Sequence, residues 1–449
     1  MQGTTGTSVG ENSTRRAVLA SMGAAGALTL AGCVGDDDDD DDDDEELADD
    51  DLTIGVAIPQ DSGRTSEGQQ LLDGYELASD HIDDGSGAIT VEPWEDISED
   101  GDVLGGELEL LVEDTGGTAT AATTAAESLV DQGADMLTGG ASHEEGIAIQ
   151  EVADDEGVIY MGGYVTADEV GGENCSQYAF HEMYNVEIAV ESLAEEIIDE
   201  LGAGSSITFT QLYTSDPYGE SFASAFERRL EAVGGWFQPD SNEVSSGDTY
   251  ESTIASELDA GRELIVLNLY GRDGARGVRD FANAIEANDD VDHDDVLAVV
   301  PILDPQTAAD AGGALEDVLG TVHWLPGLGG PFSTAFEDEW DGSTGNPTQF
   351  AHLAYTQLCQ YVAAVERAGS KEAGDVIAEL EGREYDVGTG QQLLRECDHQ
   401  AMRHAPVVRG VSEARRAPGN YYELVRAPDD GAVNPPYGCE EGPAFNCDL

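Results

Sequence analysis

The chain has 449 residues, of which 94 are Asp or Glu and 18 are Lys or Arg, so its formal net charge is −76 at pH 7. This balance argues against nucleic-acid binding, which needs a basic face, and it causes strong self-repulsion at ordinary salt. Because the Debye length is only about 3 Å at 1 M salt, we expect a surface adapted to an organism that lives in very high salt.

Residues 1–32 have the organisation of an export signal. An arginine pair, Arg15-Arg16, precedes an uncharged and mostly apolar stretch, Ala17–Leu30, and two small residues follow before Cys33. The stretch is too short to span a bilayer comfortably. The arginine pair resembles a twin-arginine signal, which exports folded proteins, and the end resembles a lipobox, so we expect Cys33 to be lipidated. The alternative is an uncleaved amphipathic or buried N-terminal helix.

Residues 33–51 are predicted to form an acidic, disordered tether. Nine consecutive aspartates begin at Asp36, and two glutamates follow them. Like charges repel, so this segment stays extended and would hold a folded domain away from a membrane surface. A calcium-binding role lacks the loop glycine and the ligand spacing that such a site needs.

Five cysteines follow the lipobox, and no CxxC pair or His/Cys cluster points to a metal. Disulfides are permitted outside the cell. Cys439 and Cys447 lie close together in a tail rich in Pro and Gly, so we predict that they pair, and we predict a second bridge between Cys175 and Cys397. Cys359 lies in an apolar helical run and is predicted to be a buried free thiol.

From Leu52 the chain alternates between strand-like and helix-like segments. Leu52–Ile58 is β-branched and apolar, whereas Ser66–Asp83 has helical spacing of its apolar residues. A further predicted helix begins at a Thr cap and stops at Gly133. Short apolar strands with helices between them are typical of a parallel sheet that is covered on both faces.

The same alternation continues in a second block, with a predicted helix over Val186–Leu201 and a strand over Ser206–Tyr213. About 400 residues suit two domains. We therefore predict an α/β fold with two doubly wound parallel-sheet lobes, a hinge and multiple crossovers. The predicted parts are 52–180 with about 327–390 for the first lobe, 181–326 with about 391–430 for the second, and 431–449 for a C-terminal tail.

Two Gly-rich turns follow strands of the first block. Gly139 to His143 follows the third strand, and Gly162 to Thr166 follows the fourth. Open α/β sheets bind ligands at the carboxyl ends of their strands, and free N–H groups at a helix start favour a carboxylate. The alternative is that Ser142 and Thr166 only cap helices.

At these turns the sequence resembles the branched-chain amino acid type of solute-binding protein (periplasmic-binding-protein type I), which serves ABC transporters. The resemblance covers roughly residues 52–425 in order and spacing. It is carried by the segments TSEGQQLLDGYELASDHID, VEDTGGTATAATTAAESLV, GGASHEEGIAIQEVADDEGVIYMGGYVTADEV and TSDPYGESFASAFERRLEAVGG.

The resemblance implies a set of ligand-binding residues. The serine and the second turn of the family hold the ligand's carboxylate, an acidic residue holds its amino group, and aromatic residues cover its apolar part. Tyr164 and Val165 stand where the family usually has small residues, so they put the ligand's identity in doubt. The implied residues are Ser142, Tyr164, Val165, Thr166, Tyr218, Tyr270, Asp304 and Phe350.

The resemblance also implies a function: hinge closure on a branched-chain or related amino acid, delivery to membrane permease subunits, and no chemistry on the ligand. No metal or cofactor is expected, and the protein would be lipid-anchored on the outer face of the cytoplasmic membrane. Amides, urea or another small carboxylate remain alternative ligands. A secreted hydrolase and a sensing ectodomain are rival hypotheses, although no HExxH is present and the one GxSxG match, Gly6–Gly10, lies ahead of the arginine pair in the part that export would remove.

Overall fold

The computed structural model describes residues 19–20, 51–166, 168–340, 345–416, 421–428, 437–447 and 449. Cys33, the tether up to Asp50 and the export signal apart from the two-residue strand β1 (Leu19–Ala20) lie outside these ranges. Within the described ranges, no helix combines the length and the apolar character that crossing a bilayer requires.

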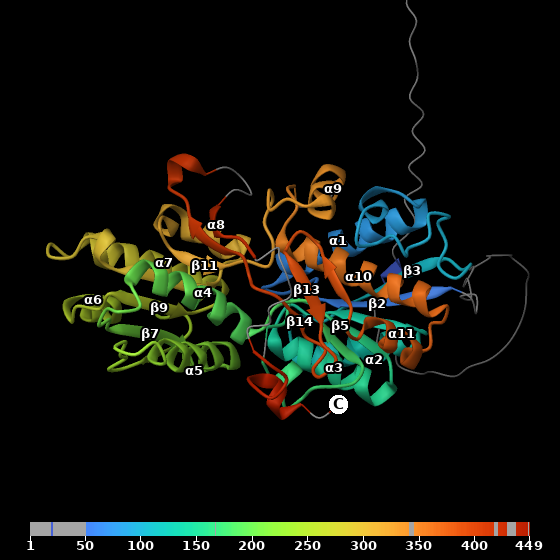
Figure 1. Cartoon of the computed structure of the whole chain (residues 1–449), viewed down its shortest axis with the longest axis horizontal. Helices are drawn as coiled ribbons and strands as arrows, with labels where there is room; N and C mark the ends of the chain where they lie inside the picture. The colour runs from blue at the N-terminus through green and yellow to red at the C-terminus, as the bar shows by residue number, and fades with distance from the viewer. Residues whose placement is uncertain are drawn as a thin grey trace, which may run out of the picture.

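Two α/β lobes lie side by side along the long axis of the molecule (Figure 1). The first lobe is built on a parallel sheet in the order β3-β2-β4-β5-β6, with β1 paired to the outer edge of β3. Helices α2 and α3 pack together against one face, and α1 and α10 pack together against the other. Its elements are β2 (Leu52–Ile58), α1 (Thr65–Asp84), β3 (Leu108–Asp114), α2 (Ala119–Asp131), β4 (Met136–Gly139), α3 (His143–Glu156), β5 (Ile159–Gly162), β6 (Ala179–His181), α10 (Gln349–Ala368) and α11 (Ala373–Leu380).

The second lobe is built on a sheet in the order β16-β15-β11-β10-β9-β7-β8, in which β15 runs antiparallel to both of its neighbours, β11 and β16. Helices α4 and α5 pack together on one face, and α6, α7 and α8 cover the other. Its elements are α4 (Val186–Leu201), β7 (Phe209–Thr214), α5 (Pro217–Glu231), β8 (Asn242–Val244), α6 (Glu251–Asp259), β9 (Leu264–Asn268), α7 (Gly271–Glu286), β10 (Leu297–Ile302), α8 (Pro305–Ala311), β11 (Leu319–Thr321), β15 (Val407–Gly410) and β16 (Tyr422–Arg426). The predicted doubly wound α/β class is confirmed.

A small antiparallel sheet, β12-β13-β14, lies beside the first lobe, where Gln400 bridges to His181 of β6. The sequence predicts that residues from about 391 to 430 belong to the second lobe. In the structure β13 and β14 instead pair with β12, and only β15 and β16 join the second sheet. The elements are β12 (Glu384–Asp386), β13 (Gln391–Leu394), β14 (Ala401–Met402), α9 (Pro331–Glu339) and the 3₁₀ helices η1 (Gly87–Thr90), η2 (Asp168–Gly171), η3 (His293–Asp295), η4 (Gly312–Leu315), η5 (Glu413–Arg415) and η6 (Pro443–Asn446).

The chain passes between the lobes after β6, after β11 and after β14, and buried side chains join these crossing segments. Gln400 Nε2 donates to the carbonyls of His181 and Met183 at 3.0 and 2.9 Å. Arg403 Nη2 lies 2.7 Å from His323 Nδ1, which joins the third crossing to the second. These bonds hold the crossing segments together as one hinge region.

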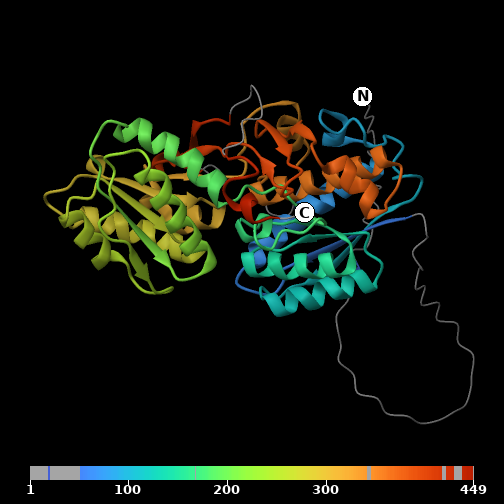
Figure 2. The ribbon, with the colours of Figure 1, turned by 60° about the horizontal axis from the view of Figure 1, so that its bottom comes forward.

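Both predicted disulfide pairings are wrong, although the four cysteines are the predicted ones. The structure pairs Cys175 with Cys447 and Cys397 with Cys439, and Cys359 is a buried free thiol as expected. Short separation in sequence favoured a local bridge. In the structure Cys447 of the tail instead bonds to Cys175 of the first lobe, and Cys439 bonds to Cys397 in the turn between β13 and β14. Figure 2 shows the red tail against the first lobe.

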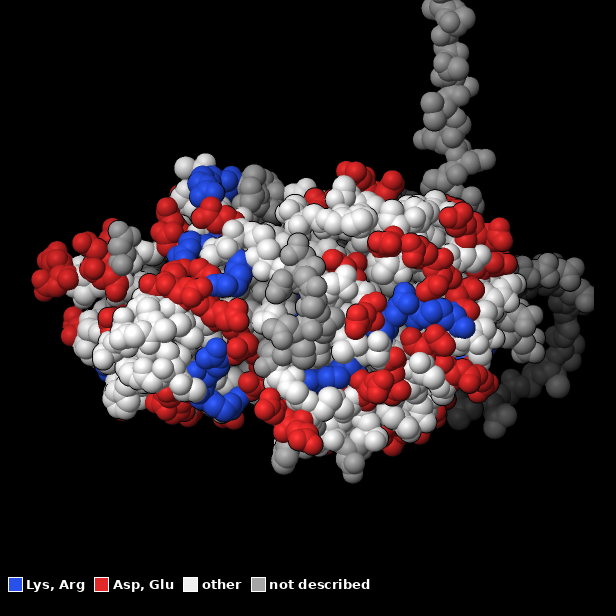
Figure 3. Space-filling view, viewed as in Figure 1, with Lys and Arg blue, Asp and Glu red and all other residues white. Residues whose placement is uncertain are grey.

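The surface carries the charge that the composition predicts. Figure 3 shows Asp and Glu over much of the molecule, with Lys and Arg set among them. Arg426, for example, contacts the carboxylates of Glu196 and Asp199 on α4. Pairs of this exposed kind contribute little individually, and dissolved salt screens the repulsion among the remaining carboxylates.

A candidate ligand-binding cleft between the lobes

A cavity of about 290 Å³ lies between the two lobes, near the lower end of the range of about 300–1,000 Å³ typical of small-molecule sites. Its lining comes from the carboxyl ends of parallel strands in both lobes, which is where open α/β sheets bind ligands. The lining residues are Arg64, Ala141, Ser142, His143, Glu144, Tyr164 and Thr166 from the first lobe, and Thr214, Asp216, Pro217, Tyr218, Ser246, Tyr270, Asp273 and Ile302 from the second.

The first-lobe wall is formed by the two predicted glycine turns. Gly139 has a φ of +110°, and a Cβ on Gly163 would come within 2.2 Å of the Gly139 carbonyl oxygen, so both positions require glycine. This close approach places Ser142 and Thr166 on the same side of the cavity.

The hydroxyls of this wall are already hydrogen-bonded within the protein. Ser142 caps α3: its Oγ accepts from the Glu145 N–H at 3.3 Å and donates to Glu145 Oε2 at 2.9 Å. Thr166 Oγ1 lies 2.8 Å from His143 Nε2. Burial, followed by the positive charge of Arg64, lowers the pKa of His143 to about 4, so its ring is neutral near pH 7.

Three tyrosines give the cavity its aromatic character. The hydroxyls of Tyr164, Tyr218 and Tyr270 are buried and have no hydrogen-bond partner among the described residues, and the same holds for His143 Nδ1. The Tyr218 and Tyr270 rings contact each other at 5.4 Å between centroids. Burial raises the pKa of all three hydroxyls well above the ordinary value of 10, so they remain protonated and can donate. Buried polar atoms usually have partners, so these four point to a ligand that supplies them.

Charged groups surround these tyrosines. Arg64 Nη1 donates to the Ala141 carbonyl at 3.1 Å, and its guanidinium lies 5.1 Å from the centre of the Tyr270 ring. Three carboxylates, those of Glu144, Asp216 and Asp273, also line the cavity. The cleft can therefore offer both a cation and anions to a solute.

Five of the eight predicted ligand residues line the cavity, and three do not. Val165 is buried against Gly146 of α3, because its side chain points away from the cleft. Asp304 caps α8: one carboxylate oxygen accepts from the N–H groups of Gln306 and Thr307, both at 2.8 Å. These bonds occupy the group that was expected to hold an ammonium.

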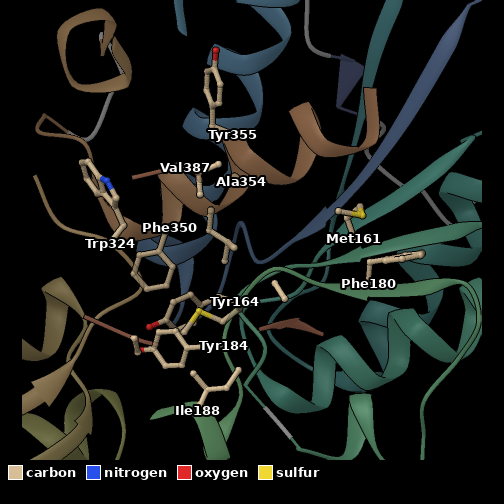
Figure 4. Packing of buried hydrophobic residues seen from close by; sticks show 14 of the residues in the cluster. Met161, Tyr164, Phe180, Tyr184, Ile188, Trp324, Phe350, Ala354, Tyr355 and Val387 are labelled. Atoms are coloured by element: carbon tan, nitrogen blue, oxygen red, sulfur yellow. The ribbon is translucent and has the colours of Figure 1, made fainter. Parts of the chain in front are cut away.

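Phe350 lies behind the cavity wall rather than in it. Its ring packs against Tyr164 with 4.3 Å between centroids, and Figure 4 shows the two rings next to each other. Phe350 therefore supports the tyrosine that faces the cleft.

Several lining residues carry no sequence prediction, Arg64 and Asp216 among them. Arg64 lies in the loop between β2 and α1, and Asp216 lies just beyond the end of β7. A place after a strand is the signal for both residues. The prediction used this signal after the third and fourth strands of the first block and for Tyr218, but not after the first strand of the first block.

The comparisons with known proteins agree with this geometry. The sequence profile described as periplasmic binding protein matches residues 51–415. The chain is 23% identical to the Leu/Ile/Val-binding protein BraC3 of Rhizobium johnstonii over 363 residues, which are 78% of this chain and 89% of that protein.

Solved structures share the fold at low sequence identity. An amino acid ABC transporter substrate-binding protein from Pseudomonas fluorescens Pf-5 superposes with a TM-score of 0.75 at 18% identity, covering 90% of this chain and all of that one. A solute-binding protein of an ABC transporter from Rhodopseudomonas palustris BisB5, in complex with 3,4-dihydroxybenzoic acid, gives a TM-score of 0.69 at 14% identity, covering 86% and 99%. Because the family profile spans most of the chain, this protein belongs to the periplasmic binding protein family.

Proposed function

We propose that this protein is the extracytoplasmic solute-binding subunit of an ABC importer, and that it captures a branched-chain or related amino acid, or a similar small solute. The observation that carries the proposal is the cavity between the lobes, which presents buried tyrosine hydroxyls without partners. The Rhizobium relative is named for leucine, isoleucine and valine, and the Pseudomonas structure for amino acids.

The proposed mechanism is closure of the two lobes on the solute. Tyr164 belongs to the first lobe and Tyr218 to the second, so a solute in the cavity contacts both. A ligand that makes more contacts in the closed state shifts the hinge equilibrium toward that state. Permease subunits would recognise the closed form, and the solute would leave unchanged.

The ligand can be tested by thermal unfolding in molar salt. We expect an α-amino acid or a small organic acid to raise the melting temperature, since a ligand that binds only the native state at 100 times its Kd stabilises it by about 2.7 kcal/mol. The panel holds L-leucine, L-valine, benzoate, urea, acetamide and two neutral sugars. A panel in which only the sugars shift the transition would contradict the proposal, and hydrolysis of a panel member would favour a secreted hydrolase.

We also propose that the N-terminal residues export the chain and anchor it through a lipid on Cys33. The support is the order of an arginine pair, an apolar stretch and a cysteine. In a haloarchaeal or other high-salt host, Cys33→Ser should move the protein from the membrane fraction to the medium. Arg15→Lys with Arg16→Lys should keep it inside the cell, and equal membrane recovery of Cys33→Ser and wild type would remove the lipid anchor.

A further inference from the structure

The cleft contains a cation without a carboxylate partner. Carboxylates outnumber cations about fivefold in this chain, and most of its arginines with described side chains form ion pairs, as Arg229 does with Glu191. Arg64 has no ion pair within 4 Å among the residues that the structure describes. Its guanidinium donates from Nη1 to the Ala141 carbonyl. A guanidinium has five N–H donors, so most of the donors of Arg64 remain available.

The buried carboxyl groups of Glu67 and Asp304 do not neutralise Arg64. Glu67, in the first turn of α1, interacts with Arg64 electrostatically but lies beyond ion-pair distance. Burial raises the pKa of Glu67, and the negative charge of Asp304 adds to this rise, whereas Arg64 and Arg272 oppose it. Asp304 itself is committed to capping α8. The positive charge of Arg64 therefore faces a cavity that it also lines.

The two hydroxyls that the family resemblance assigns to the ligand's carboxylate are committed elsewhere. Ser142 donates its only hydroxyl proton to Glu145 Oε2, and Thr166 is bonded to His143. Glu145 is fully buried directly behind Ser142. A ligand carboxylate placed against Ser142 would meet that neighbouring negative charge, and its burial would strengthen the repulsion.

The surroundings of Arg64 suit an anion. The Tyr270 ring lies beneath the guanidinium at 5.1 Å and orients it, and the Tyr270 hydroxyl is buried without a partner. A planar guanidinium can hold a carboxylate through two parallel hydrogen bonds. Tyrosine hydroxyls that stay protonated can add further donors.

Resting on the proposed function, we propose that Arg64 is the carboxylate-binding residue of the cleft, and that the solute is a small organic acid recognised through its carboxylate. The neutral amides and urea that the sequence left open are then excluded as ligands. Ser142 and Thr166 shape the wall and hold the α3 turn, but they do not anchor the carboxylate.

The test uses Arg64→Gln, Arg64→Lys and the double variant Ser142→Ala with Thr166→Ala, all in the full mature chain in molar salt. Calorimetry measures Kd for L-leucine and benzoate and for their neutral counterparts leucinamide and benzamide. A charge-assisted hydrogen bond corresponds to about a 10- to 100-fold change in Kd. We expect Arg64→Gln to weaken binding of whichever acid binds by that factor, Arg64→Lys to weaken it less, and the double variant to change it by less than about threefold.

The amides separate a charge contact from a general disturbance of the cleft. Wild type should prefer each bound acid to its amide by at least about tenfold, and Arg64→Gln should abolish this preference. Equal binding of acid and amide by wild type, unchanged acid binding by Arg64→Gln, or a larger loss in the double variant would each overturn the role of Arg64 while leaving a solute-binding function intact. Wild-type protein that binds none of the acids would contradict both proposals. Unliganded melting temperatures check that each variant folds.

Discussion

Removing the two disulfides is expected to lower the free energy of unfolding by about 2–4 kcal/mol for each bridge. Cys175–Cys447 spans 272 residues and Cys397–Cys439 spans 42 residues, so each closes a long loop in the unfolded chain. The bridges also hold Tyr437, whose hydroxyl accepts from Asn185 at the start of α4 and whose carbonyl accepts from Arg395 at 2.9 Å. Total stabilities of proteins are typically 5–15 kcal/mol, so this loss is large.

Denaturant unfolding in molar salt measures the effect, with Cys175→Ser/Cys447→Ser and Cys397→Ser/Cys439→Ser as paired variants. The variant that combines both pairs of substitutions, and so lacks both bridges, should be insensitive to reductant. Reductant should shift the unfolding midpoint of wild type to that of this combined variant. Cys359 is fully buried, so in every folded protein it should react with thiol reagents only after unfolding. An unchanged midpoint without the bridges would show that the tail contributes nothing to the stability of the first lobe.

Local periodicity predicted the fold well, because each lobe repeats one local pattern. The predicted strand Leu52–Ile58 and the predicted helix Val186–Leu201 coincide with β2 and α4. Long-range pairing carries no such local signal. The disulfide partners and the placement of β13 and β14 beside the first lobe depend on where the chain returns after its last crossings, and spacing in sequence does not encode this.

The site was predictable where it follows from sheet topology. Ser142 and Thr166 lie in turns that follow strands, the family resemblance adds Tyr164 and Tyr218, and all four line the cavity. Side-chain direction was harder to predict. Val165 lies beside Tyr164 in sequence, yet it points toward α3.

The sequence also does not show whether a polar side chain forms its hydrogen bonds with a ligand or within the protein. An Asp after a strand can hold a ligand or cap the next helix, and Asp304 caps α8. Arg64 escaped notice because its isolation from carboxylates appears only in three dimensions. What distinguishes Arg64 is that it has no ion pair among the described residues and also lines the cavity.

Below pH 6.5, each of four buried histidines is expected to lower the stability of the folded protein by about 1.4 kcal/mol per pH unit. Burial lowers the pKa of His181 and His352 to about 3 and of His143 to about 4, and it lowers that of His323 well below 6.5. In the unfolded chain these four rings take up protons near pH 6.5, whereas in the folded protein they stay neutral. Each therefore removes about 1.4 kcal/mol per pH unit as the pH falls through this window.

Buried carboxyl groups act in the opposite direction. Burial raises the pKa of Glu182 to about 7 and that of Asp168 well above 3.8. The folded protein therefore keeps protons that the unfolded chain has lost, and its stability increases as the pH falls. Burial also raises the pKa values of Glu67, Glu187, Glu200 and Asp304. These carboxyl groups therefore offset part of the loss that the histidines cause.

His181 provides the group-specific check. Its ring is buried, and neither ring nitrogen has a hydrogen-bond partner among the described residues. His181→Leu removes the titration but keeps an apolar side chain of similar size, so its stability should depend less on pH than that of wild type, by about 1.4 kcal/mol per pH unit below pH 6.5. Denaturant midpoints at pH 7.5, 6.5 and 5.5 measure both slopes. The value at pH 7.5, where the ring is neutral in both states, isolates the packing cost of the substitution. Parallel curves for the two proteins would show that His181 is protonated alike in the folded and unfolded chain, and the buried-histidine explanation would then fail.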